Sequence, residues 1–268
     1  MLQYKLYLCQ LIHCIMPITD FLFAFLAAIA AGIINAIAGG GTLVTFPVLT
    51  AIGIAPVVAN VTNTVALCTG LLSGTYAQRK DFKAQKKRLW KILPMGVAGG
   101  IAGGLILLNT KESSFNALIP YLILLATILL ALQVPVKNWI AARLARHENK
   151  KHNPVTLYIL IFLAAIYGGY FGAGLGIILM AVLGLVLDDS LTSLNVLKQA
   201  ISFCINLAAA IYFAFSGQVI WTVALVMAAG AITGGLIGGR LAGKLKPEIL
   251  RWTVVSIGLL VAVIYFFR

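Results

Sequence analysis

The chain has 268 residues, of which 61% are hydrophobic and only 10% are charged, and its 20 lysine and arginine residues far outnumber its 7 acidic residues. A soluble domain carries charge on roughly 25% of its residues, so this composition excludes an ordinary soluble enzyme, a disordered chain and a free DNA-binding domain. The apolar runs are continuous, as in membrane-spanning helices, whereas the strands of an outer-membrane barrel alternate polar and apolar residues. We therefore expect an all-α polytopic membrane protein.

The apolar runs predict ten membrane segments, eight of them long enough to cross a bilayer. The second and seventh have about 13 residues, which as a helix is roughly 20 Å against a hydrocarbon core of about 30 Å. Each of these two short segments follows a glycine cluster, the first at 39–41 and the second within 168–176. The segments are residues 18–38, 42–54, 56–78, 89–109, 115–134, 155–174, 175–187, 190–214, 219–239 and 248–267.

The two short segments lie at matching places in two similar halves of the chain. An offset of 135 residues places Gly39 on Gly174 and Asn60 on Asn195, and an offset of 131 places 103–106 on the identical run 234–237. This similarity predicts a first transmembrane repeat at 1–134, a basic cytoplasmic linker at 135–154 and a second repeat at 155–268. Glycines spaced four residues apart within the repeats predict close helix–helix contacts; they are Gly96, Gly100, Gly104, Gly230, Gly234 and Gly238.

Positive charges gather in the stretches between apolar runs, and such clusters mark the cytoplasmic side. The stretch 79–91 is strongly basic, whereas its counterpart in the second half, 215–219, carries no charge. Matching loops on opposite sides of the membrane require two inverted repeats of about five segments each. The same basic stretches favour contact with membrane lipid, and we expect no nucleic-acid partner.

The glycine clusters point to a binding site for an anion. A helix that begins inside the membrane exposes its first N–H groups and the positive end of its dipole there, and both attract negative charge. The alternative is that the glycines only allow helices to pack closely. The predicted substrate-binding residues of these two starts are Gly39, Gly40, Gly41 and Thr42, and Gly172, Gly174 and Gly176.

Polar residues form a stripe on segment 190–214 and recur at the equivalent place on segment 56–78. Because polar side chains are costly against lipid, we expect them to face a path through the protein, the alternative being hydrogen bonds between helices. Lys198 is the one charge well inside a segment; we expect it to contact the anion, although its amine could instead reach the membrane surface. The predicted substrate-binding residues are Asn60, Asn63, Thr64, Asn195, Lys198, Gln199 and Ser202.

Other chemistry has little support in the sequence. Asp188 and Asp189 precede segment 190–214 as helix-capping or first-turn acids, with proton coupling as the alternative. We find no nucleophile elbow, phosphate-binding loop or metal-ligand pattern. We therefore expect no enzyme, no catalytic residue, no bound metal and no cofactor.

Two pairs of motifs resemble the signatures of the TauE/SafE sulfite exporter family. The first pair is Asn35–Pro47, read as NAIAGGGTLVTFP, followed by Ala59–Leu67; the second is Tyr167–Ile177, read as YGGYFGAGLGI, followed by Leu194–Lys198. The resemblance covers nearly the whole chain. It implies a multi-pass permease of the bacterial inner (cell) membrane for a small sulfur-containing anion such as sulfite, a sulfonate or sulfoacetate.

The sequence thus predicts a secondary transporter that works by alternating access at a site in the middle of the membrane. An anion channel with the same site is one alternative. Another is a membrane assembly factor whose basic loops dock acidic partners, and a membrane enzyme is disfavoured. The glycine-rich helices are also compatible with a homodimer.

Overall fold

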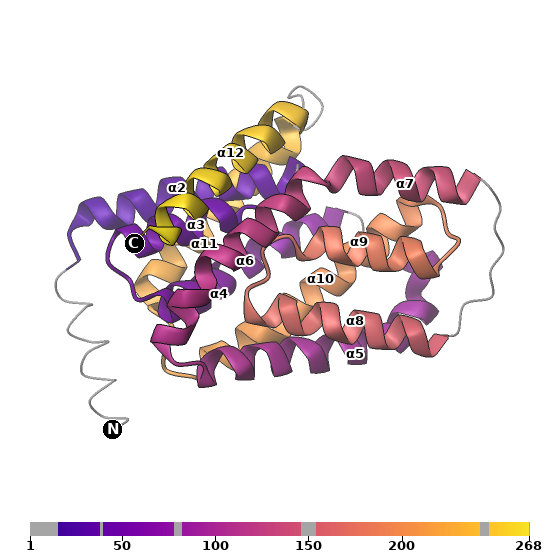
Figure 1. Cartoon of the computed structure of the whole chain (residues 1–268), viewed down its shortest axis with the longest axis horizontal. Helices are drawn as coiled ribbons and strands as arrows, with labels where there is room; N and C mark the ends of the chain where they lie inside the picture. Colours follow the sequence, from indigo (N-terminus) through magenta and orange to yellow (C-terminus); the bar gives the residue numbers. More distant parts are fainter. Residues whose placement is uncertain (1–15, 38–39, 78–81, 146–153, 242–246, 268) are drawn as a thin grey trace.

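The computed structural model describes residues 16–37, 40–77, 82–145, 154–241 and 247–267, and within these ranges every regular element is a helix (Figure 1). The helices are α2 (Ile18–Ile37), α3 (Thr42–Ala51), α4 (Pro56–Ala77), α5 (Phe82–Asn109), α6 (Glu112–Ala131), α7 (Gln133–Ala145), α8 (Pro154–Tyr170), α9 (Leu175–Val186), α10 (Leu191–Ala214), α11 (Trp221–Leu241) and α12 (Pro247–Phe266).

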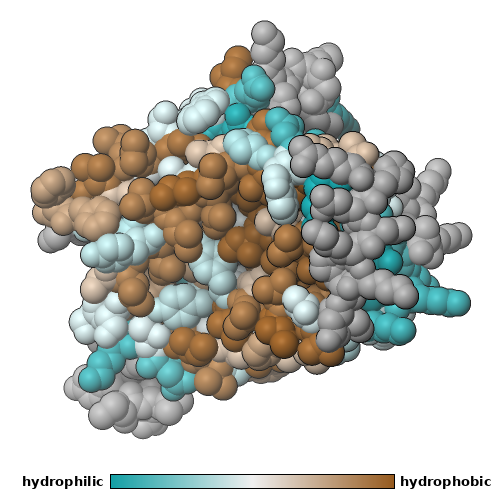
Figure 2. Space-filling view, turned by 45° about the vertical axis from the view of Figure 1, so that its right-hand side comes forward, coloured by the Kyte–Doolittle hydropathy of each residue, from teal (hydrophilic) through white to brown (hydrophobic). Residues whose placement is uncertain are grey.

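The predicted all-α membrane architecture is confirmed. Six helices, α2, α5, α6, α10, α11 and α12, are long and apolar enough to cross a membrane over their described residues. Large apolar side chains point outward from them; on α12, for example, Leu260 is 61% exposed. Figure 2 shows a face on which hydrophobic residues cover much of the surface and hydrophilic residues gather towards the edges. Such a surface is stable against lipid and unstable against water.

The two predicted short segments are short helices. The helix α3 has 10 residues and α9 has 12. The preceding helix α8 ends at Tyr170, so the last four residues of the predicted segment 155–174 lie in a loop. The chain turns there because Gly172 and Gly174 adopt φ values of +76° and +79°, which side chains other than glycine rarely tolerate.

The helix α7 is the element that the sequence analysis did not anticipate. It occupies 133–145, where the basic linker begins, so the first part of the predicted linker is helical. Its inward residues recur with helical spacing and end in Ile140, which is fully buried against α9. The sequence analysis interpreted the lysine and arginine residues of this stretch only as a topology signal, and therefore missed the short amphipathic helix.

The pairing of the helices is consistent with the predicted repeat. The most extensive contacts join α2 to α11 and α5 to α8. If α2 corresponds to α8, α4 to α10 and α5 to α11, then the α2–α11 pair of helices corresponds to the α8–α5 pair. In the same way, the α5–α10 pair corresponds to the α11–α4 pair. Two halves of similar sequence therefore pack on each other in a similar way.

Single glycines also make corresponding contacts in the two halves of the chain. A Cβ atom on Gly103 would lie 2.0 Å from the Ile166 carbonyl oxygen, and one on Gly234 would lie 2.1 Å from the Ile29 carbonyl oxygen. Ile29 and Ile166 end two identical runs, Phe25–Ile29 and Phe162–Ile166, a sign of the repeat that the sequence analysis overlooked. Backbone-to-backbone contact at Gly100, Gly230, Gly234 and Gly238 confirms the predicted helix–helix role of those glycines.

Substitution of Gly103 by alanine tests this packing. The new methyl group would overlap a backbone carbonyl that cannot rotate away, so we expect a loss of about 1–3 kcal/mol in the free energy of unfolding. Thermal unfolding in detergent measures the change. Gly70→Ala is the matched control, because its methyl group would meet the nearest atom at 3.8 Å. Equal melting temperatures for the two variants would contradict the prediction.

Candidate functional site

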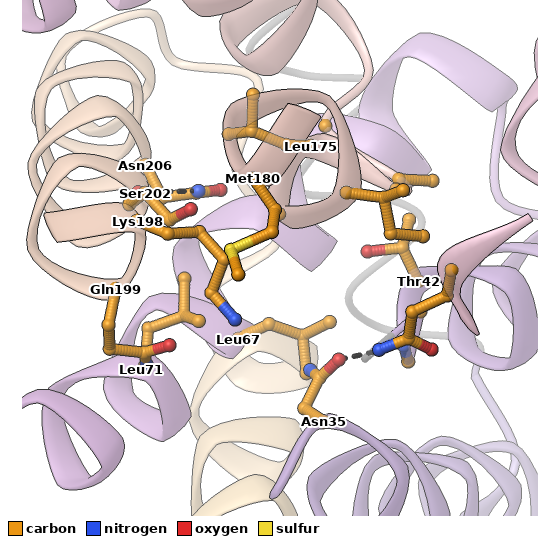
Figure 3. A pocket seen from close by; sticks show the side chains of 18 of the residues that line it. Asn35, Thr42, Leu67, Leu71, Leu175, Met180, Lys198, Gln199, Ser202 and Asn206 are labelled. Carbon is orange, nitrogen blue, oxygen red and sulfur yellow. Dashed lines mark hydrogen bonds between the residues drawn. The ribbon is translucent and has the colours of Figure 1, made fainter. Parts of the chain in front are cut away.

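The starts of the two short helices open onto one cavity of about 610 Å³ (Figure 3). This volume is in the range of small-ligand sites, about 300–1,000 Å³. The cavity is also lined by one face each of α4, α7 and α10. Of the predicted substrate-binding residues, those that line it are Gly40, Gly41, Thr42, Asn63, Thr64, Gly172, Gly174, Gly176, Asn195, Lys198, Gln199 and Ser202.

The two remaining predicted residues have different outcomes. Gly39 lies outside the described residues. Asn60 does not line the cavity. It is almost completely buried, and its Nδ2 donates a hydrogen bond of 2.8 Å to the Tyr170 carbonyl at the end of α8. Asn60 therefore links α4 of the first half to the glycine loop of the second half.

An aromatic contact joins α3 to the glycine loop that precedes α9. The ring of Phe46 on α3 meets the ring of Phe171 edge to face, with centroids 5.6 Å apart, and Phe171 directly precedes the glycine loop. Within the second half, the Tyr167 hydroxyl donates a hydrogen bond of 2.6 Å to the Ala173 carbonyl. The glycine loop is therefore held by one contact from the first half of the chain and one from the second half.

The start of α3 satisfies most of its own backbone groups. The Gly41 N–H donates to Oδ1 of Asn35 at 2.8 Å. The N–H groups of Leu43 and Val44 donate to the carbonyls of Gly40 and Gly41, each at 3.0 Å. The helix dipole remains available to an anion here, but these donors are already engaged.

The start of α9 combines an open backbone donor with a nearby cation. The N–H groups of Leu175 and Ile177 donate to the carbonyls of Gly172 and Gly174, whereas the Gly176 N–H has no acceptor among the described residues. A Cβ on Gly176 would meet one side chain, the Cδ of Lys198 at 3.8 Å. Of the two helix starts, α9 therefore offers an anion the better combination of donors and positive charge.

The predicted polar stripe of α10 faces this cavity along its length, ending at Asn206. The side chain of Lys198 extends from α10 into the space between Met180 and Leu67 (Figure 3). Lys137 of α7 is a second cation on the lining, and the lining contains no aspartate or glutamate among the described residues. The cavity is thus positively charged, which favours anions over cations.

Two buried oxygens on the lining have no hydrogen-bond partner among the described residues. They are Oδ1 of Asn63 and Oγ of Ser202, whose side chains are 1% and 7% exposed. Buried polar atoms in folded proteins are nearly always paired. A ligand in the cavity is one way to complete these bonds, since the serine hydroxyl can donate to an anionic oxygen.

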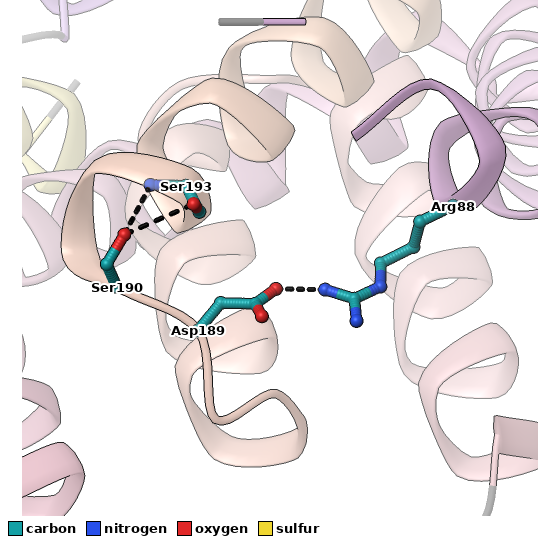
Figure 4. A network of polar contacts seen from close by, with 4 residues as sticks. All are labelled: Arg88, Asp189, Ser190 and Ser193. Atoms are coloured by element: carbon teal, nitrogen blue, oxygen red, sulfur yellow. Dashed lines mark hydrogen bonds and ion pairs between the residues drawn. The ribbon is translucent and has the colours of Figure 1, made fainter. Parts of the chain in front are cut away.

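The interpretation of Asp188 and Asp189 as capping or first-turn acids is wrong. Ser190 is the N-cap of α10, where its hydroxyl accepts from the Ser193 N–H. Asp189 instead pairs with Arg88 of α5 (Figure 4), and Asp188 lies 3.9 Å from Arg143 of α7. These ion pairs tie the α9–α10 loop, which precedes the cavity-lining start of α10, to two neighbouring helices.

Sequence reasoning missed cavity residues outside the two glycine clusters and the polar stripes. Asn35 lies six residues before Gly41, and only the fold reveals that its side chain accepts a hydrogen bond from the Gly41 N–H. Gln133 was placed at the end of the predicted segment 115–134 and Lys137 in the linker, so the short helix α7 that presents both residues to the cavity was missed. Met180 and Leu71 line the cavity as apolar side chains, which carry no distinctive signal in a membrane sequence.

Comparisons with known proteins agree with this architecture. The model of a family described as "Sulfite exporter TauE/SafE" matches residues 24–265. A probable membrane transporter protein of Haemophilus influenzae is 29% identical over 86% of this chain and 88% of its own length. A similar protein of Sinorhizobium, ORF9, is 29% identical over 90% of each chain, and YfcA of Escherichia coli K12 is 24% identical over 87% and 84%. No solved structure matches the chain.

Substitution of Tyr167 by phenylalanine tests the support of the glycine loop. Loss of the hydroxyl leaves the Ala173 carbonyl without its donor, so we expect unfolding to become easier by about 0.5–1.5 kcal/mol. Thermal unfolding in detergent measures this change. Tyr121→Phe is the control, since Tyr121 is 61% exposed on α6. A Tyr167→Phe variant as stable as the control would contradict the role assigned to the hydroxyl.

Proposed function

Because the chain belongs to the sulfite exporter TauE/SafE family, as a multi-pass bacterial membrane transporter, we propose that its cavity binds a small sulfur-containing anion such as sulfite, a sulfonate or sulfoacetate and carries it across the membrane. The observation that carries this proposal is the position of Lys198, whose side chain passes over Gly176 at the open start of α9. A cation and a helix N-terminus there act on the same anion.

Each element of the cavity contributes a different part of the binding energy. The Gly176 N–H and the dipole of α9 attract the oxyanion from one side. The Lys198 ammonium neutralises its charge, and the hydroxyl of Ser202 and the amide of Gln199 supply polar contacts that fix its orientation. The process is transport without a chemical step, and it requires no enzyme activity, metal or cofactor.

We propose that alternating access arises from two inverted repeats. The correspondence between helix pairs in the two halves supports this proposal, as do the matching glycine contacts at Gly103 and Gly234. Hydrogen bonding between Asn60 and the Tyr170 carbonyl joins the halves beside the cavity, so movement of one half would be transmitted to the glycine loop of the other. In a cell that is negative inside, export of each negative charge is favoured by about 2.3 kcal/mol per 100 mV.

Transport by the purified protein in liposomes tests the anion site. We expect saturable flux and counterflow of a sulfur oxyanion from a panel of sulfite, methanesulfonate, sulfoacetate, sulfate and acetate. Lys198→Gln should raise the half-saturating concentration by about 10- to 100-fold, the value of a charged hydrogen bond. The control is Lys91→Gln, which removes an exposed charge of α5 outside the cavity lining. Unchanged saturation in Lys198→Gln would refute its binding role, and flux that does not saturate would favour a channel.

Labelling of introduced cysteines tests the inverted topology. Lys87 of α5 and Phe215, in the loop before α11, are both exposed. Lys87→Cys should react with an impermeant thiol reagent only after the inner side of the membrane is opened, and Phe215→Cys should react in intact cells. The unsubstituted protein gives the background from native cysteines. Reaction of both positions from the same side would exclude inverted repeats.

A further inference from the structure

We propose that Lys137 of α7 is a second cation of the substrate site and that it sets the preference of the transporter for the charge of the anion. This inference rests on the proposed function. It concerns the helix α7, most of which lies in the predicted linker between the two repeats.

The position of α7 is fixed by its contacts with α9. Ile140 is fully buried, and its side chain fills the space beside Gly184, where a Cβ would come within 2.6 Å of it. One turn further on, Arg143 donates a hydrogen bond of 2.7 Å to the Gly184 carbonyl and another to the Leu185 carbonyl. These bonds cap the end of α9, where helix carbonyls lack partners and a cation is favoured. The two helices therefore form one unit.

This anchorage directs one face of α7 to the cavity. Gln133, Val136 and Lys137 all line the cavity, and their spacing places them on one side of a helix. Ile140 continues the same stripe onto α9. In contrast, Trp139 is 50% exposed on the outer side. Lys137 thus belongs to the anchored face of α7, although its side chain is exposed enough to meet water at the cavity opening.

The two lysines lie at different depths in the same cavity. Lys198 is partly buried over Gly176, whereas Lys137 is exposed. No carboxylate on the described lining offsets either charge. Coulomb energy is proportional to the charge of the ligand, so a second lysine benefits a dianion twice as much in energy as a monoanion. A single deep lysine supplies a charge for one anionic group, and the second lysine extends the positive field to the opening.

The experiment compares two probes of similar length that differ in charge. Ethanesulfonate carries one negative charge and 1,2-ethanedisulfonate carries two. Their half-saturating concentrations as inhibitors of sulfur-oxyanion flux are measured in liposomes for the wild type, Lys137→Gln, Lys137→Arg and Lys87→Gln. Lys87 is the matched control, an exposed lysine of α5 that does not line the cavity.

In Lys137→Gln we expect binding of ethanesulfonate to weaken by roughly two- to threefold, the effect of an exposed charge pair. Binding of ethanedisulfonate should weaken by about the square of that factor, because its energy of interaction doubles. Both losses should shrink as ionic strength rises, since exposed charges are screened. Lys137→Arg should restore the wild-type values, and Lys87→Gln should retain them.

Equal losses for the two probes would overturn the proposal, as would no loss for either or an equal effect of Lys87→Gln. A wild-type protein that shows no saturable flux of any sulfur oxyanion would instead refute the proposed function. Saturable flux with unaltered charge preference in Lys137→Gln would leave the proposed function intact and remove Lys137 from the site. The two failures are therefore distinguishable.

Discussion

A helix that stops inside a membrane leaves backbone groups that lipid cannot satisfy, and this constraint governs the structure of the site. The backbone N–H groups at the starts of the two short helices meet this constraint differently. At α3, the side chain of Asn35 accepts from the Gly41 N–H, and nearby carbonyls accept from the following residues. At α9, the Gly176 N–H stays open to the cavity beside Lys198. The satisfaction of the broken helices and the proposed binding of an anion therefore depend on the same local geometry.

Close packing around the breaks makes this geometry possible. Helices α5 and α8, and likewise α2 and α11, approach so closely that no side chain larger than hydrogen is accommodated at Gly103 or Gly234. Between lipid-exposed helices there is no hydrophobic driving force, so contact at short range and polar bonds must supply the cohesion. The edge-to-face contact of Phe46 with Phe171 joins α3 to the glycine loop before α9, beside the cavity. Rigid pairs of long helices therefore surround short, glycine-bounded ones.

Much of this arrangement could be predicted from the sequence, because the relevant signals are periodic or repeated. Apolar length identified the helices, and the spacing of Asn195, Lys198 and Ser202 identified the face of α10 that lines the cavity. The role of Asn60 could not be predicted in the same way. It occupies the same helix as Asn63, yet its amide bonds to Tyr170, a residue 110 positions away. Whether a polar side chain meets a cavity or a carbonyl depends on packing between helices.

The basic residues show most clearly why position in the fold matters. A cluster of lysine and arginine residues beside an apolar segment indicates the cytoplasmic side, but the same residues differ in what they contact. Arg143 caps α9 and lies near Asp188, Arg88 pairs with Asp189, and Lys137 lines the cavity. Two of these charges therefore fix the loop and helices around the opening, which leaves Lys137 as the one of the three whose charge is directed at the cavity. The basic clusters predict the orientation of the chain in the membrane, whereas the anchorage of α7 determines which of its charges faces the cavity.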